Sequence, residues 1–136
     1  MRDGRTRKLK SKDLGAGDIR EFMSRFSVRV VVLSGPAAGQ EIPVDRACTT
    51  FGRGPGVDVA FDDATMSRQH AAVEFSNGSF RIRDLGSTNG MTVNNSPVQA
   101  ADLDHGDRFE LGALQFQLVI DEPEPAVETY ELSTGA

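Results

Sequence analysis

Three short polar motifs lie between residues 51 and 90: Phe51-Gly52-Arg53, Ser67-Arg68-Gln69-His70 and Ser87-Thr88-Asn89-Gly90. Each motif lies between apolar runs and contains residues that favour turns, so each is expected on a loop. Their side chains are mainly hydrogen-bond donors, and the glycines allow backbone N–H groups to approach a ligand closely. Such a set of donors suits an anion.

Short strand-like runs surround these motifs. They cover residues 28–33, 40–44, 48–51, 59–60, 71–75, 80–84, 92–93, 98–99, 108–111 and 114–120. Asn77-Gly78 and Asn94-Asn95 lie between such runs and indicate tight hairpins, since Asn and Gly tolerate positive φ. Many short strands with frequent turns predict an all-β sandwich of mostly antiparallel strands.

Alternation along these runs predicts which side chains form the core. Phe80 and Ile82 are expected to point inward and Arg81 and Arg83 outward. The same pattern places further apolar side chains inside, namely Phe109, Leu111, Leu114, Phe116 and Leu118.

The lone cysteine and the lack of long apolar segments predict a cytoplasmic protein. Cys48 cannot form an internal disulfide, and we expect it to be a small core residue in a reducing compartment. No stretch approaches the roughly eighteen apolar residues of a membrane span, and the basic N-terminus leads into no signal-type run. A membrane partner is therefore not expected.

Composition divides the 136 residues into three parts. Residues 1–26 form a basic N-terminal tail, in which Ile19, Phe22, Met23 and Phe26 recur at helical spacing and predict a short helix with Asp18 as N-cap. Residues 27–120 are expected to form the folded domain. Residues 121–136 are rich in acidic residues and proline and are expected to form a flexible acidic tail.

The charge distribution argues against a nucleic-acid-binding domain. Residues 31–120 contain six basic and eleven acidic side chains, and residues 121–136 contain five acidic ones and no basic one. A nucleic-acid-binding domain would present a basic folded face. Arg53 and Arg68 nevertheless lie within the loop motifs, so a local positive site is expected in an acidic field.

The ordered series of loop motifs resembles the forkhead-associated (FHA) domain family, whose members bind phosphothreonine peptides. The resemblance covers roughly residues 27–120 and includes the flanking segments Val57–Asp63 and Leu103–Gly112. It implies an FHA-like β-sandwich that acts as a non-catalytic adaptor in Ser/Thr kinase signalling. The implied partner is a threonine-phosphorylated protein or peptide, with a Ser/Thr kinase as a further partner.

By this resemblance, five residues form the phosphopeptide site. Arg53, Ser67 and Arg68 would bind the phosphate, Thr88 would help to hold the phosphothreonine, and Asn89 would bond the main chain of the peptide. Three more residues, Gly52, His70 and Gly90, would support the loops structurally.

Other functions are less consistent with the residues. Ser67 and His70 could suggest a nucleophile and base, but no strained Gly-x-Ser-x-Gly elbow is present and the arginines suit binding better, so no enzyme activity is expected. One cysteine and two distant histidines offer no metal cluster, and no cofactor is expected. The alternative is a phosphate-independent interaction module with the same fold.

The acidic tail contains a candidate phosphoacceptor, Thr129, in Val127-Glu128-Thr129-Tyr130-Glu131. A phosphorylated Thr129 would occupy the loop site of its own chain or of a neighbour, because tethering raises the effective concentration. The alternative is a tail that only aids solubility.

Overall fold

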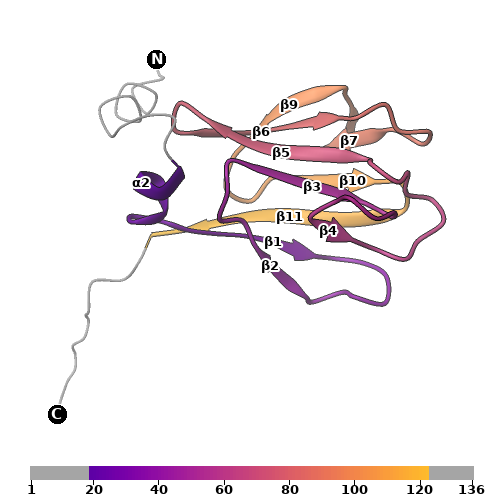
Figure 1. Ribbon diagram of the computed structural model, residues 1–136, viewed down its shortest axis with the longest axis horizontal. Coiled ribbons are helices and arrows are strands. Elements are labelled where there is room, and N and C mark those ends of the chain that lie inside the picture. The colour runs from indigo at the N-terminus through magenta and orange to yellow at the C-terminus, as the bar shows by residue number, and fades with distance from the viewer. Residues whose placement is uncertain (1–18, 123–136) are drawn as a thin grey trace, which may run out of the picture.

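The computed structural model describes residues 19–122, which fold into two β-sheets packed face to face (Figure 1). The first sheet contains six strands in the order β2 (Glu41–Pro43), β1 (Ser27–Val32), β11 (Leu114–Asp121), β10 (Arg108–Leu111), β7 (Met91–Val93) and β8 (Ser96–Pro97). The second contains five strands in the order β4 (Val59–Ala60), β3 (Cys48–Gly52), β5 (Ala71–Ser76), β6 (Ser79–Asp84) and β9 (Ala100–Leu103). All paired strands are antiparallel except β3 and β4. The predicted all-β sandwich is confirmed.

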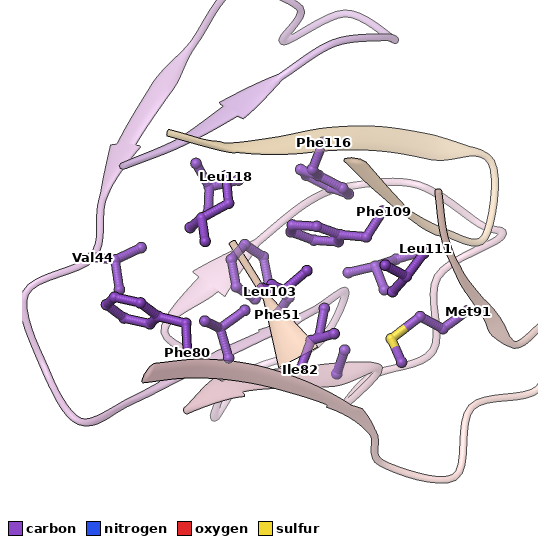
Figure 2. Close-up of a cluster of buried hydrophobic side chains, with 14 of the residues drawn as sticks. Val44, Phe51, Phe80, Ile82, Met91, Leu103, Phe109, Leu111, Phe116 and Leu118 are labelled. Atoms are coloured by element: carbon purple, nitrogen blue, oxygen red, sulfur yellow. The ribbon is translucent and has the colours of Figure 1, made fainter. Parts of the chain in front are cut away.

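Large apolar side chains fill the space between the two sheets (Figure 2). Phe51 comes from β3, whereas Phe109 and Phe116 come from the opposite sheet, and the ring centroids of Phe51 and Phe116 lie 5.8 Å apart. Burying one such ring contributes about 1.5–3 kcal/mol. The predicted inward side chains are all buried, namely Phe80, Ile82, Phe109, Leu111, Leu114, Phe116 and Leu118.

Two tight turns follow the sequence prediction. Asn77 and Gly78 have φ angles of 54° and 80°, and Asn94 and Asn95 have φ angles of 49° and 72°. The flanking strands pair directly on both sides of each turn. Positive φ at both central residues defines the type I′ hairpin turn, so both predicted hairpins are confirmed.

The strand predicted at Val98-Gln99 is wrong, because the chain passes between the two sheets there. The Val98 N–H donates to the Met91 carbonyl of β7 (3.1 Å), whereas the Gln99 carbonyl accepts from the Asp84 N–H of β6 (2.8 Å). The strands β8 and β9 lie on either side of this crossover.

The predicted core position of Cys48 is also wrong, since its side chain is exposed. Thr49 and Phe51 of the same strand are buried, so the alternation of β3 turns Cys48 to the outer face. The large Phe51 ring sets this alternation.

The predicted lead-in helix is present as α2 (Ile19–Met23). Its Phe22 ring packs against Phe75 and Phe80, with centroid distances of 4.9 Å and 5.5 Å. Asp18, the expected N-cap, lies outside the described residues. Between residues 19 and 122, no helix has the length and apolar character that crossing a membrane requires.

Strand register gathers the three motif loops at one end of the sandwich. Phe51, near the end of β3, pairs with Ala71 at the start of β5, and Ala71 pairs with Asp84 at the end of β6. The loops after β3, before β5 and after β6 therefore leave the sheet side by side. Helix α2 lies at the opposite end (Figure 1).

Candidate functional site

Arg53 directly follows β3 and is anchored to the loop before β5. Its backbone N–H donates to the Ser67 carbonyl (3.0 Å), and its Nε donates to the Met66 carbonyl (3.1 Å). The residue is exposed, and its two terminal nitrogens have no hydrogen-bond partner within residues 19–122. The bond from Nε fixes the guanidinium plane while the remaining N–H groups stay available to a ligand.

Gly52 and Gly54 allow the two arginine loops to lie against each other. A Cβ atom at Gly52 would lie 1.9 Å from the Arg68 carbonyl oxygen, so only glycine fits there. A Cβ at Gly54 would lie 2.9 Å from Cγ of Arg68, whose side chain therefore crosses this glycine. Arg68 is exposed. Arg53 and Arg68 thus extend from adjoining backbones.

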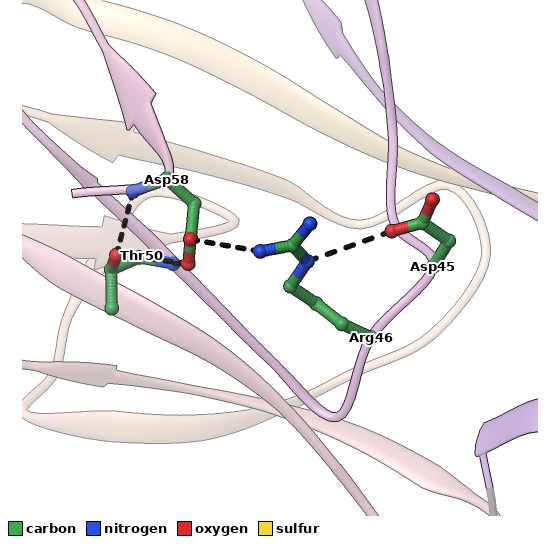
Figure 3. Close-up of polar contacts among 4 residues, drawn as sticks. All are labelled: Asp45, Arg46, Thr50 and Asp58. Atoms are coloured by element: carbon green, nitrogen blue, oxygen red, sulfur yellow. Dashed lines mark hydrogen bonds and ion pairs between the residues drawn. The ribbon is translucent and has the colours of Figure 1, made fainter.

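A polar cluster fixes the return of the loop after Arg53 (Figure 3). The Asp58 carboxylate accepts hydrogen bonds from the N–H and the hydroxyl of Thr50, at 2.8 Å and 3.0 Å, and from Arg46 at 3.1 Å. The Asp58 N–H donates to the Thr50 hydroxyl oxygen (2.9 Å). These bonds, led by the Thr50 N–H, hold the pKa of Asp58 below its ordinary value. The carboxylate is therefore a fixed anchor for β4.

His70 is fully buried beneath the loops and joins two of them. Its Nδ1 accepts the Ser67 N–H (3.1 Å), and its Nε2 lies 2.7 Å from the Gly90 carbonyl oxygen. A carbonyl oxygen can only accept, so Nε2 carries the proton and Nδ1 does not. The neutral ring therefore ties the loop before β5 to the loop after β6.

Ser67 connects the same two loops through its side chain. Its Oγ accepts the Thr88 N–H (2.9 Å), and the side chain is half-buried. Since this bond uses a lone pair, the hydroxyl proton remains available for donation. Thr88 is exposed, and its hydroxyl has no partner among residues 19–122.

Asp84 shapes the loop after β6. Its carboxylate accepts hydrogen bonds from the Gly86 N–H (2.7 Å), the Ser87 N–H (2.6 Å) and the Ser87 hydroxyl (2.7 Å). Ser87 Oγ in turn accepts the Gly90 N–H (2.9 Å), and Gly90 has φ +81°. Partial burial would raise the pKa of Asp84, but the bonds from Ser87 and Gly86 outweigh it and lower the pKa. The loop is therefore closed on an ionised carboxylate.

Asn89 is exposed at the tip of this loop, and its amide is already engaged in the protein. Its Nδ2 donates to the Thr65 carbonyl (2.7 Å). The amide oxygen has no partner within the described part of the chain. One side of the carboxamide is thus held and the other is open.

The two arginines of the loops differ in pairing from several other surface arginines, although Arg108 also has no ion pair among residues 19–122. Four arginines elsewhere form ion pairs: Arg29 with Asp121 and Glu41, Arg46 with Asp58 and Asp45, Arg81 with Asp102, and Arg83 with Glu74. Within residues 19–122, neither Arg53 nor Arg68 forms an ion pair. Two uncompensated guanidinium groups therefore give one end of an acidic domain a local positive charge.

Ser67 and His70 are not arranged as nucleophile and base. The unprotonated Nδ1 of His70 accepts the backbone N–H of Ser67 and not its hydroxyl. The described residues contain no group of three or more His, Cys, Asp or Glu side chains placed to hold a metal ion. The loops offer free N–H and O–H donors, which suit an anion.

All five predicted binding residues and all three predicted support residues lie at this end of the sandwich. The sequence prediction omitted Asp84, Asp58 and Thr65. Asp84 could have been found, because Asp two or three residues before Gly and Ser is typical of a side-chain-capped turn. Asp58 bonds to Thr50 and Arg46, and Thr65 joins its loop to Asn89 and Ala113, through contacts between separate segments that no local pattern reveals.

Comparison with known sequences agrees with these motifs. The model of the FHA domain family matches residues 49–112. The chain is 43% identical over 93 residues to "Glycogen accumulation regulator GarA" of Mycobacterium tuberculosis, covering 68% of the chain and 56% of the relative. It is 41% identical over 99 residues to "Oxoglutarate dehydrogenase inhibitor" of Corynebacterium glutamicum, covering 73% of this chain and 68% of the relative. The match thus spans little more than half of the GarA sequence.

Solved structures of FHA domains have the same fold. The FHA domain of the CT664 protein from Chlamydia trachomatis aligns with a TM-score of 0.64 and 31% identity, over 68% of this chain and 96% of that one. Mycobacterium tuberculosis EmbR, in complex with a low-affinity phosphopeptide, aligns with a TM-score of 0.65 and 27% identity, over 74% of this chain and 26% of that one. From its motifs, its fold and these similarities, the chain belongs to the FHA domain family.

Proposed function

We propose that this chain is a non-catalytic adaptor that binds threonine-phosphorylated proteins in Ser/Thr kinase signalling in the cytoplasm. The observation that carries the proposal is the unpaired state of Arg53 and Arg68 on adjoining loops, next to the free hydroxyl proton of Ser67. A phosphate monoester carries nearly two negative charges and three acceptor oxygens. Several donors on a rigid frame are what such a group requires.

In this proposal each loop residue has a separate role. The terminal nitrogens of Arg53, the guanidinium of Arg68 and the Ser67 hydroxyl donate to the phosphate oxygens. Thr88 lies beside the phosphothreonine side chain, and Asn89 bonds the peptide main chain. A methyl pocket there would favour phosphothreonine over phosphoserine by about 0.8 kcal/mol, the contribution of one buried carbon.

The relatives support an adaptor role through their names. One relative is named a regulator and the other an inhibitor, and the EmbR structure contains a phosphopeptide. We extend phosphopeptide binding to this chain because it shares the EmbR fold and presents two arginines, a serine and an asparagine on adjoining loops. The natural partner is then a threonine-phosphorylated protein, and the kinase that phosphorylates it is a second candidate partner.

Fluorescence anisotropy with a phosphothreonine peptide library tests the proposal. Phosphorylated peptides should bind, and phosphatase treatment should abolish binding. Arg53→Ala should weaken binding about ten- to a hundredfold, since it removes hydrogen bonds between charged groups. Arg108→Ala is the matched control, because Arg108 is also exposed and without an ion pair among residues 19–122 but lies on β10.

Two results would contradict the proposal. Equal binding of unphosphorylated peptides would favour the phosphate-independent interaction module. Equal losses in Arg53→Ala and Arg108→Ala would indicate general charge attraction instead of a phosphate site.

Thr129 lies outside the described residues and stays a predicted phosphoacceptor. The strand that leads toward it, β11, ends at Asp121, at the end of the sandwich far from the loops. Mass spectrometry after incubation with Ser/Thr kinases tests the prediction. Absence of phosphate on Thr129 would contradict it.

A further inference from the structure

Thr65 lies where three segments of the chain meet, although no sequence motif singles it out. Its carbonyl oxygen accepts a hydrogen bond (2.7 Å) from Nδ2 of Asn89, which lies in the loop after β6. Its Oγ1 accepts the Ala113 N–H (2.8 Å) from the turn between β10 and β11. Its own N–H and hydroxyl donate to the Asp63 carboxylate, at 2.8 Å and 2.5 Å. One residue therefore joins the loop before β5 to both neighbouring loops.

The turn between β10 and β11 fits tightly against Thr65. Gly112 has φ +60°, and a Cβ atom there would lie 2.5 Å from both the carbonyl oxygen and Oγ1 of Thr65. Gly106, at the other end of the sandwich, also has a positive φ (+89°), but a Cβ there would meet nothing within 4 Å. A side chain at residue 112 would thus displace Thr65, whereas the same change at residue 106 would not.

The bond to Thr65 determines what Asn89 presents to a ligand. Because a carbonyl oxygen can only accept, the Asn89 atom that faces Thr65 must be the amide nitrogen. The planar amide then directs Oδ1 away from Thr65, where it has no partner among residues 19–122. An outward acceptor is complementary to a backbone N–H of a bound peptide.

We propose that Thr65 is a positioning residue for peptide recognition. It holds Asn89 so that the carboxamide oxygen accepts a main-chain N–H of the ligand, and it couples this contact to the turn at Gly112. The inference rests on the proposed phosphopeptide function. The Thr65 hydroxyl is expected to affect the peptide contact and not the phosphate contact. Arg53 is anchored to the Met66 carbonyl, and Ser67 is anchored to His70 and Thr88. Neither anchor involves the Thr65 hydroxyl.

Substitution of Thr65 tests this separation with two probes. Thr65→Val removes the hydroxyl at nearly constant volume, and Thr65→Ser retains it. Thr65→Val should weaken binding of a phosphothreonine peptide by about three- to tenfold, the effect of one or two hydrogen bonds. Binding of O-phosphothreonine, which has the phosphate but no flanking peptide bonds, should be unchanged in an NMR titration. Thr65→Ser should restore peptide affinity.

Equal peptide affinities for Thr65→Val and Thr65→Ser would overturn the inference. So would an equal loss of both probes in Thr65→Val, since that would indicate a general collapse of the loops.

A second pair of variants tests the coupling without removing a hydrogen-bonding side chain, and it applies even where Thr65→Val does not fold. Gly112→Ala should weaken peptide binding and spare O-phosphothreonine, whereas Gly106→Ala, which also places a side chain at a positive φ, should change neither. Equal peptide binding by these two variants overturns the role of Thr65 while the phosphopeptide function stands. A wild-type chain that binds neither probe overturns the proposed function and this inference together.

Discussion

At the scale of single residues, the site depends on the close approach of two backbones at Gly52. A Cβ there would lie 1.9 Å from the Arg68 carbonyl oxygen, a backbone atom that cannot move without displacing Ser67 and His70. Gly54 lies beside the same loop but faces the side chain of Arg68. The two glycines therefore differ in the kind of neighbour that a methyl group would meet.

We predict that Gly52→Ala lowers the free energy of unfolding by about 1–3 kcal/mol, the usual cost of an overpacked site. Gly54→Ala should have a smaller effect, because the flexible Arg68 stem can move aside. Urea denaturation followed by circular dichroism measures both values. Equal losses in the two variants would contradict the close contact of the two backbones.

Residue roles could be predicted from the sequence only where a local pattern carries them. The donors Arg53, Ser67 and Arg68 lie in short motifs, and all reach the same end of the sandwich. The Thr65 bond to Asn89 spans 24 positions, and no periodicity predicts such a contact. The sequence prediction for Cys48 is wrong because the alternation of β3 determines which side chains are buried more strongly than the average burial of cysteine does.

At the scale of elements, the loop after β6 depends on the Asp84 carboxylate. This group accepts three hydrogen bonds from Ser87 and Gly86, and its pKa lies below the ordinary value. A lowered folded-state pKa means that ionised Asp84 stabilises the fold at a pH above its unfolded pKa of about 3.9. That contribution is lost as the pH falls through the folded-state value.

Asp84→Asn should therefore lower the free energy of unfolding at pH 7 by about 1.5–3 kcal/mol, the range for hydrogen bonds to a charged group. The difference from wild type should shrink as the pH falls below about 4, because the wild-type carboxyl then becomes neutral too. Asp102→Asn is the control: its side chain is 73% exposed in a surface pair with Arg81, which contributes little. Urea titrations at several pH values measure the difference, and a constant difference between wild type and Asp84→Asn would contradict the role of the charge.

Strands and turns were predictable wherever alternation and turn residues agreed. Asn77-Gly78 and Asn94-Asn95 determine two hairpins by local chemistry alone. Val98 and Gln99 were not predictable in this way. Val98 bonds to β7 in one sheet, and Gln99 bonds to β6 in the other. A crossover is a property of the tertiary fold, and a strand-like pair of residues does not reveal it.

At the scale of the whole molecule, the sandwich separates the core from the loops that carry donors. Aromatic rings from both sheets pack between them, and helix α2 packs against Phe75 and Phe80 at the end far from the loops (Figure 1). Residues 31–120 contain six basic and eleven acidic side chains, yet Arg53 and Arg68 extend unpaired from one end. The fold thus concentrates positive charge in a small region of an acidic domain.

An NMR titration of the isotope-labelled chain with a phosphothreonine peptide tests the central claim most directly. Amide shifts should concentrate in residues 52–54, 66–70 and 86–90, and the unphosphorylated peptide should leave these signals unchanged. Shifts centred on helix α2 and the turn at Asn77, or equal shifts with both peptides, would contradict a phosphate site on the loops.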